Sequence, residues 1–188
     1  MKKYIYTLFL FSAISLYSQE RGDEKSFVLV NISAISPIGI FLENWNIGGG
    51  AYLGYGWRFM SEWEFNFQIG YNRYRLFSDS EYSNTPKLSM FAFQIGGRHY
   101  FLQNTVKPYI TTLGGVNIIR LFYNLDEQQI DERATHLNFQ MGGGIVVEIC
   151  SHLELDLSIL YNSHLINPSI PYNLTGFEYG IGAKWVFE

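Results

Sequence analysis

The sequence predicts an all-β fold, a single eight-stranded antiparallel up-and-down barrel over residues 26–188. Four segments alternate strictly between apolar and polar residues, which is the period of a β-strand. Short turns and longer polar loops alternate along the chain, as they do in a barrel built from hairpins. Aromatic residues make up 18% of the chain and charged residues only 16%, a balance that disfavours disorder.

The N-terminal segment, residues 1–18, is predicted to be a cleaved secretory signal peptide. Lys2 and Lys3 form a positive start, an apolar stretch follows, and small residues near Ser18 allow cleavage. Residues 19–25 form a short lead into the first strand. Removal of the signal peptide takes away two lysines and no acidic residue, so the formal net charge changes from −4 to −6. A net-acidic chain is a poor nucleic-acid binder, and we expect no nucleic-acid partner.

Eight segments are predicted to form the strands, in the order of the chain. The four clearest carry large apolar residues on one face and amides, carboxylates or glycine on the other. These are Trp63–Asn72, Leu137–Ile149, Leu153–Tyr161 and Phe177–Phe187. Four segments with weaker patterns complete the count, and they are Phe27–Ile40, Ile47–Phe59, Leu88–Phe101 and Tyr109–Tyr123. The pattern leaves open which face of the first and the fifth strand points inwards.

The connections alternate in length. Short turns are predicted near Met60–Glu62, Gln103–Val106 and Cys150–His152. Longer polar loops are predicted at Leu42–Asn46, Ser78–Lys87, Leu125–Thr135 and Asn167–Asn173. Because the number of strands is even, both ends of the barrel domain lie on the side of the short turns.

The faces of the strands favour a membrane barrel over a soluble one. In an outer-membrane barrel the apolar face contacts lipid and the lumen is polar. The polar faces are rich in glycine, which weakens a solvent-facing strand but leaves room for long side chains inside a narrow barrel. Aromatic residues gather near strand ends, as in interfacial girdles. The girdle beside the short turns is predicted to contain Trp57, Trp63, Tyr109, Trp185 and Phe187.

The signal peptide, the eight alternating segments and a final strand that ends with Tyr179–Glu188 carry a family resemblance. The chain resembles the OmpA/OmpX-type small outer-membrane barrels, especially the porin-family proteins with an "outer membrane protein beta-barrel domain". The resemblance covers the whole mature chain and implies an integral outer-membrane protein. It also implies partners: outer-membrane lipid, lipopolysaccharide, and the barrel-assembly machinery, which reads a terminal strand that here ends Phe187-Glu188. We expect a monomer.

Inward-facing charges are predicted to gather near the short turns. Opposite charges in a low-dielectric interior must pair, and eight strands leave an interior that side chains just fill. We therefore predict a structural charge cluster that closes the lumen, with a narrow channel for small solutes as the alternative. The predicted members are Arg58, Glu64, Arg98, Glu148, Glu154 and Lys184.

The predicted function is non-enzymatic, a structural or surface-interaction role through the outer loops, for which no residue pattern selects a ligand. The main rival is a lipid-modifying enzyme of the lipid A deacylase kind, because Ser163 and His164 lie near the last outer loop. Neighbouring residues on a strand point to opposite faces, however, which suits a nucleophile and base poorly. The histidines lack metal-ligand spacing, and we expect no catalytic residue, cofactor or metal. A soluble lipocalin-like carrier is the least favoured alternative.

Overall fold

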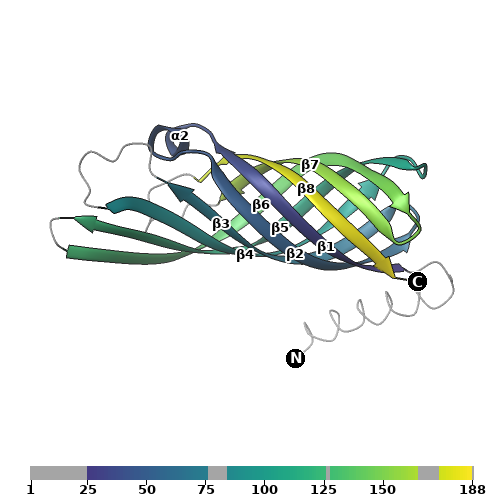
Figure 1. Ribbon diagram of the computed structural model, residues 1–188, viewed down its shortest axis with the longest axis horizontal. Coiled ribbons are helices and arrows are strands. Elements are labelled where there is room, and N and C mark those ends of the chain that lie inside the picture. The colour runs from purple at the N-terminus through teal and green to yellow at the C-terminus, as the bar shows by residue number, and fades with distance from the viewer. Residues whose placement is uncertain (1–24, 76–83, 126–127, 165–173, 188) are drawn as a thin grey trace, which may run out of the picture.

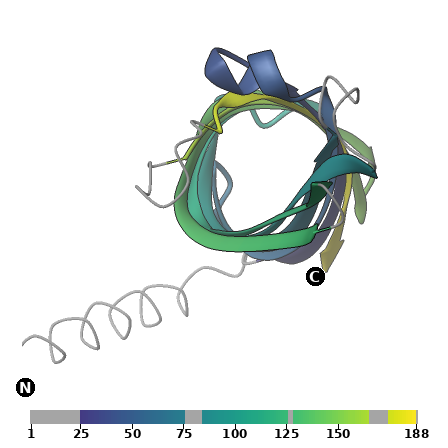
Figure 2. The same cartoon turned by 90° about the vertical axis from the view of Figure 1, so that its left-hand side faces the viewer.

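The computed structural model describes residues 25–75, 84–125, 128–164 and 174–187. These residues form a closed antiparallel barrel in which each strand pairs with its neighbours in the chain and β8 closes on β1 (Figures 1 and 2). The strands are β1 (Lys25–Pro37), β2 (Gly48–Met60), β3 (Trp63–Arg75), β4 (Asn84–Tyr100), β5 (Val106–Leu125), β6 (Gln128–Cys150), β7 (Leu153–His164) and β8 (Gly176–Phe187). The predicted fold class is confirmed. The predicted signal peptide lies outside the described residues, as does all of the lead except Lys25.

The two ends of the barrel differ. At one end, which we call the turn end, tight connections join β2 to β3, β4 to β5 and β6 to β7, and β1 begins and β8 ends there. At the other, the loop end, lie the short helix α2 (Ile40–Asn44), the last residues of β5 and the first residues of β6 (Figure 1). No helix among the described residues is long and apolar enough to cross a membrane.

The strands turn their apolar faces outwards and their polar faces inwards. On β3, Phe65 and Phe67 are 39% and 44% exposed, whereas the intervening Asn66 is 3% exposed and Glu64 is 1% exposed. The lumen of a soluble barrel would show the opposite arrangement, so the membrane assignment of the two faces is confirmed. The sequence left open which face of β1 and of β5 points inwards. The structure answers this, because Phe27 and Leu29 of β1 and Asn117 of β5 are buried in the lumen.

Inward-facing glycines make room for large side chains of neighbouring strands. A Cβ at Gly70 would come within 2.2 Å of the Tyr52 ring, and a Cβ at Gly144 within 2.6 Å of the Tyr109 hydroxyl. Any larger residue at either position would push these aromatic side chains away. Glycine on the polar faces therefore belongs to the packing of the lumen.

The predicted loop Leu125–Thr135 is wrong. Strands β5 and β6 stay paired out to Leu125 and Gln128, so this segment continues the hairpin instead of leaving it. Asn84 likewise begins β4 inside the predicted loop Ser78–Lys87. Beyond a bilayer both faces of a strand meet water, so polar residues there are compatible with continued pairing.

The predicted loop Leu42–Asn46 is partly helical. Helix α2 ends at Asn44 and lies on the rim of the barrel (Figure 2). Phe41 and Trp45 lie four residues apart, and both are buried in the mouth of the lumen. Trp45 caps the helix, and its backbone N–H donates to the Phe41 carbonyl at 3.0 Å. The predicted loop Asn167–Asn173 lies outside the described residues.

Candidate functional site

Lys184 is the centre of a group of paired charges at the turn end of the lumen. Its side chain is completely buried, and its Nζ lies 2.8 Å from Glu64 Oε2 and 3.5 Å from Glu154 Oε2. The ammonium also donates to the Tyr100 hydroxyl at 2.8 Å. Glu64 belongs to β3 and Lys184 to β8, two strands that are not neighbours, so this contact crosses the lumen.

Two arginines extend the group around Lys184. Arg58 Nη2 lies 2.5 Å from Glu64 Oε1 and 3.0 Å from Glu154 Oε2. Arg98 Nη2 lies 2.8 Å from Asp156 Oδ2 on β7. Each carboxylate here thus faces at least one cation, the arrangement that offsets the cost of burying ions.

The structure brings together five of the six residues predicted for this cluster. The sixth, Glu148, lies at the rim with its side chain 43% exposed and contacts Lys107 Nζ at 2.9 Å. Sequence reasoning missed Lys107 and left Asp156 outside the cluster. Lys107 bridges Glu148 and Glu154, and the sequence held no clear signal for it because the pattern left the phase of β5 open. We use the name charge cluster for Arg58, Glu64, Arg98, Lys107, Glu148, Glu154, Asp156 and Lys184.

Tyr109, predicted for the aromatic girdle, faces the lumen instead. It is only 3% exposed, and its hydroxyl donates to Asp156 Oδ1 at 2.7 Å. The Arg98 guanidinium carbon lies 3.8 Å from the centre of its ring, a cation–π contact. The cause is the phase of β5, in which Tyr109 shares a face with Lys107 and Thr111. The other four girdle residues face outwards and are 42–50% exposed, namely Trp57, Trp63, Trp185 and Phe187.

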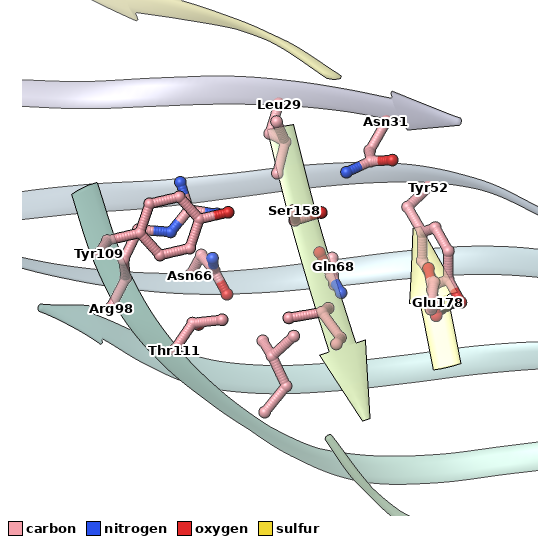
Figure 3. Close-up of a pocket in the computed structure, with 12 residues that line it drawn as sticks. Leu29, Asn31, Tyr52, Asn66, Gln68, Arg98, Tyr109, Thr111, Ser158 and Glu178 are labelled. Atoms are coloured by element: carbon pink, nitrogen blue, oxygen red, sulfur yellow. Dashed lines mark hydrogen bonds between the residues drawn. The ribbon is translucent and has the colours of Figure 1, made fainter. Parts of the chain in front are cut away.

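A small polar cavity lies in the middle of the lumen (Figure 3). It lies between the Arg98–Tyr109 pair on one side and the Tyr52–Glu178 pair on the other. Its space for the centres of water molecules is about 20 Å³. A space of this size takes a small number of waters and no larger solute.

A chain of uncharged amides fills the lumen beyond this cavity, towards the loop end. Gln68 donates to Gln94 at 2.6 Å, Gln94 to Asn138 at 3.1 Å, and Asn138 to Asn162 at 2.9 Å. Asn162 donates to the Glu178 carboxylate at 2.8 Å. This carboxylate also accepts hydrogen bonds from Tyr52 and Gln140. Among the described residues, only uncharged donors hold Glu178.

An apolar cluster occupies the mouth of the lumen at the loop end. Phe41 and Tyr74 meet edge to face there, with ring centroids 5.1 Å apart. All members of this mouth cluster are buried. They come from β1, α2 and the residue after it, β3, β4, β5 and the segment just before β8. They are Ile35, Phe41, Trp45, Tyr74, Leu88, Met90, Ile119 and Leu174.

The pair considered for catalysis is divided between two faces of β7. His164 is 5% exposed and lies in the lumen, where its Nε2 contacts Asn117 at 2.5 Å and Asn138 at 3.1 Å. Its Nδ1 contacts the carbonyl of Leu174. Ser163 lies on the opposite face, as alternation requires. Within the described part of the chain, no group of three His, Cys, Asp or Glu residues could hold a metal ion.

The β5–β6 hairpin extends past the rest of the barrel at the loop end (Figure 1). Strand β5 has 20 residues and β6 has 23, whereas β7 and β8 have 12 each. About 9–11 residues are enough to cross a bilayer. Pairing between β6 and β7 begins at Asn138 and His164, so the edge of Gln128–Ala134 that faces away from β5 has no strand partner among the described residues.

No protein-family model and no curated protein matches the sequence. Several solved structures, however, are similar to this chain. Neisserial surface protein A is 15% identical, with a TM-score of 0.57 over 87% of this chain and 97% of that chain. Ail, the attachment invasion locus protein of Yersinia pestis, solved with the heparin analogue sucrose octasulfate, is 14% identical, with a TM-score of 0.57 over 87% and 98%. The outer membrane protein OprG of Pseudomonas aeruginosa is 11% identical, with a TM-score of 0.55 over 87% and 96%.

The chain has the fold of a small outer-membrane barrel. At these identities the similarity establishes the fold alone. The fold is consistent with the OmpA/OmpX-type barrels that the sequence resembles. The outward apolar faces of this outer-membrane barrel are the surface that contacts lipid, which agrees with an integral outer-membrane location.

Proposed function

We propose that this outer-membrane barrel is a non-enzymatic surface-interaction protein with a closed lumen, which binds an extended polypeptide through the β5–β6 hairpin. The loop end faces the outside of the cell in this proposal, because barrels of this kind place short turns in the periplasm. The observation that carries the proposal is the edge of β6 over Gln128–Ala134, which has no strand partner among the described residues and lies on a hairpin longer than the membrane requires.

The contents of the lumen support closure. The charge cluster crosses the turn end through contacts between strands that are not neighbours, as in Lys184 with Glu64. The mouth cluster fills the loop end with apolar side chains. The cavity between them has room only for water. A solute would have to break buried ion pairs at one end and part packed rings at the other, so transport is disfavoured.

The open edge supports the binding role. Alternate residues on the edge of an antiparallel strand present unpaired N–H and C=O groups, which an added strand can pair with. Asp131, Glu132 and Arg133 lie along this edge and are exposed. Charged side chains on an edge disfavour pairing with a second copy of the same strand. The proposed partner is therefore a different polypeptide that binds as an added strand.

The test uses the folded chain in nanodiscs and a displayed library of random twelve-residue peptides. In a shortened hairpin, an Asn-Gly turn joins Leu121 directly to Glu132, a pair that faces each other in the ladder. We expect peptides that bind the wild type and lose binding to the shortened hairpin. Hydrogen exchange should then slow at the amides of Gln128–Ala134 when peptide is bound.

The control is Glu132→Gln, which leaves the strand edge in place and should keep most of the peptide binding. Peptides that bind wild type and shortened hairpin equally would contradict the proposal. A deletion strain with an altered lipid A acyl pattern, restored by the wild type but not by His164→Ala, would instead support the enzymatic alternative.

A further inference from the structure

The cations of the barrel are divided between three places. The 13 lysines and arginines of the chain include Lys2, Lys3 and Arg21, and the remaining ten lie in residues 25–188. Four of these ten belong to the charge cluster, and Lys25 begins β1 at the turn end. The other five lie on β3, β4, β5 and β6 near the loop end, and they are Arg73, Arg75, Lys87, Arg120 and Arg133.

The strand register gathers these five cations into one patch. Arg75 lies opposite Lys87, and Arg120 lies opposite Arg133. Ser89 lies between Arg73 on β3 and Arg120 on β5. Residues directly opposite each other share a face, and neighbouring strands lie about 4.8 Å apart. The five side chains therefore occupy two adjacent cross-strand rows on the outside of the barrel, which we call the outer basic patch.

The outer basic patch begins where the outward apolar faces end. On β3 the outward row runs through Phe67, Ile69 and Tyr71, all 39–44% exposed, and the next outward residues are Arg73 and Arg75. The same change occurs on β5, where the outward Ile118 is followed two residues later by the exposed Arg120. A cation placed just past a lipid-facing row sits at the level of the headgroups.

The patch keeps an excess of positive charge. Asp131 lies on it and pairs with Arg120 through two bonds of 2.8 Å, and it lies 3.6 Å from Arg133. The Arg73, Arg75 and Lys87 side chains have no ion-pair partner within residues 25–75, 84–125, 128–164 and 174–187. Among the described residues, Asp131 is the one carboxylate on this patch of five cations.

We propose that the outer basic patch binds the phosphate of an anionic lipid in the outer leaflet, of the lipid A class. Arginine forms bidentate hydrogen bonds with phosphate oxygens, and lysine adds a compact positive charge. The acyl chains of such a lipid would lie along the apolar row of Tyr71, Phe91 and Ile118. A soluble ligand would have no use for the adjoining apolar surface, which is why we assign a lipid.

The opposite wall of the barrel lacks such a patch, so the proposed lipid site lies on one side only. Its strands β7, β8, β1 and β2 carry no lysine or arginine at the loop end. Their outward residues there are small or aromatic, and they include Gly49, Ala51, Ala34, Ser36, Ser163, Tyr161 and Phe177. Lipid phosphate is thus expected at one sector of the barrel and not as a ring around it.

The test measures the affinity of the full barrel for lipid A in phosphatidylcholine nanodiscs or mixed micelles. The probes are lipid A with both phosphates and lipid A from which the phosphates have been removed. Inorganic phosphate and heparin serve as soluble competitors. The main variant is Arg73→Gln, Arg75→Gln and Lys87→Gln together, and the control is Lys25→Gln at the turn end. A heat-shift gel checks that each variant is a folded barrel.

We expect the triple variant to bind phosphorylated lipid A about tenfold more weakly or worse, since each cation near an anionic surface contributes on the order of a few-fold in affinity. Lys25→Gln should leave the affinity unchanged. Asp131→Asn should tighten binding about two- to threefold, because it removes the carboxylate that pairs with Arg120 and Arg133. A misfolded variant would bind lipid A more weakly, so tighter binding by Asp131→Asn cannot arise from misfolding.

The proposal is overturned if dephosphorylated lipid A binds as well as the phosphorylated lipid, or if the triple variant and Lys25→Gln behave alike. Heparin binding that depends on the patch, without lipid binding, would assign the patch to a glycan. Inorganic phosphate that binds as tightly as lipid A would show a free-anion site. The proposed peptide edge is unaffected by these outcomes.

Discussion

The two ends of the lumen use different chemistry to fill the same narrow space. Near the turn end Glu64 is surrounded by Lys184, Arg58 and Arg98. Towards the loop end Glu178 is equally buried, yet among the described residues it contacts only neutral donors such as Asn162 and Tyr52. Both carboxylates lie at inward-facing positions of alternating strands, yet they are held by very different partners. Alternation decides that a polar residue faces inwards, and the register decides what it meets.

The largest expected effect is at the centre of the charge cluster. Replacing Lys184 by Met leaves Glu64 and Glu154 without their shared ammonium group in a buried site. Breaking a buried ion pair by removing one partner typically costs about 3–5 kcal/mol, and we expect Lys184→Met to lower the free energy of unfolding by that amount. Urea titration of the barrel in bilayers measures it. A loss below about 1 kcal/mol would show that Lys184 is solvated rather than buried.

An intermediate effect is expected at the mouth cluster. Phe41→Ala removes a ring that packs against Tyr74. A buried Phe→Ala change costs about 3–5 kcal/mol in a rigid core, but α2 can detach while the barrel stays closed. We therefore expect a smaller loss in global stability, about 1–2 kcal/mol, with local opening of the mouth. Faster proteolysis at the loop end should accompany it, and unchanged proteolysis would contradict the packing role of α2.

A smaller effect is expected at Glu178. The Glu178→Gln change keeps the shape of the side chain and breaks no ion pair seen among the described residues. Its amide can still accept from Asn162 through Oε1, so the free energy of unfolding should change by less than about 1 kcal/mol. The matched variant Glu64→Gln, in the charge cluster, should cost several times more. Equal losses for the two variants would remove the distinction between the two ends of the lumen.

The smallest effect on stability is expected outside the barrel wall, at Asp131. The hydrogen bonds from Arg120 lower the pKa of the Asp131 carboxyl. The contribution of the pair to stability is therefore complete above the ordinary aspartate pKa and is lost as the pH falls through the lowered pKa. Both side chains are exposed to solvent, and such pairs contribute little. Asp131→Asn should leave the unfolding midpoint unchanged between pH 5 and 8. A clear shift would mean that the hairpin contributes to barrel stability.

Sequence alternation was sufficient to predict the strands and their inward faces where lipid contacts the other face. Within the membrane, outward residues of β3 and β8 must be apolar and inward ones must fit a crowded polar lumen, so the two-residue period survives in the sequence. Past the membrane no such constraint acts. The residues near Asp131 are polar on both faces, which made a paired hairpin resemble a loop. Helix α2 has only five residues, too few for a helical period, and only the spacing of Phe41 and Trp45 hinted at it.

The members of the charge cluster could be predicted more readily than their contacts. Inward phase and closeness to a short turn identified Glu64 and Lys184, which lie 120 positions apart. Their contact depends on the closure of β8 on β1 and on the tilt of the strands, neither of which alternation encodes. The phase of β5 was ambiguous because Tyr109 and Ile110 are both apolar enough for lipid. That ambiguity led to the wrong placement of Tyr109.

Conductance across a planar bilayer is the most direct test of a lumen closed at both ends. With the refolded wild-type barrel inserted, we expect no steady channel current, because ion pairs cross the turn end and packed rings fill the mouth. Lys184→Met combined with Phe41→Ala, which weakens both closures, should show brief openings if it folds. A stable open channel of porin size in the wild type would contradict the closed lumen, and the protein would then have to be considered a solute channel.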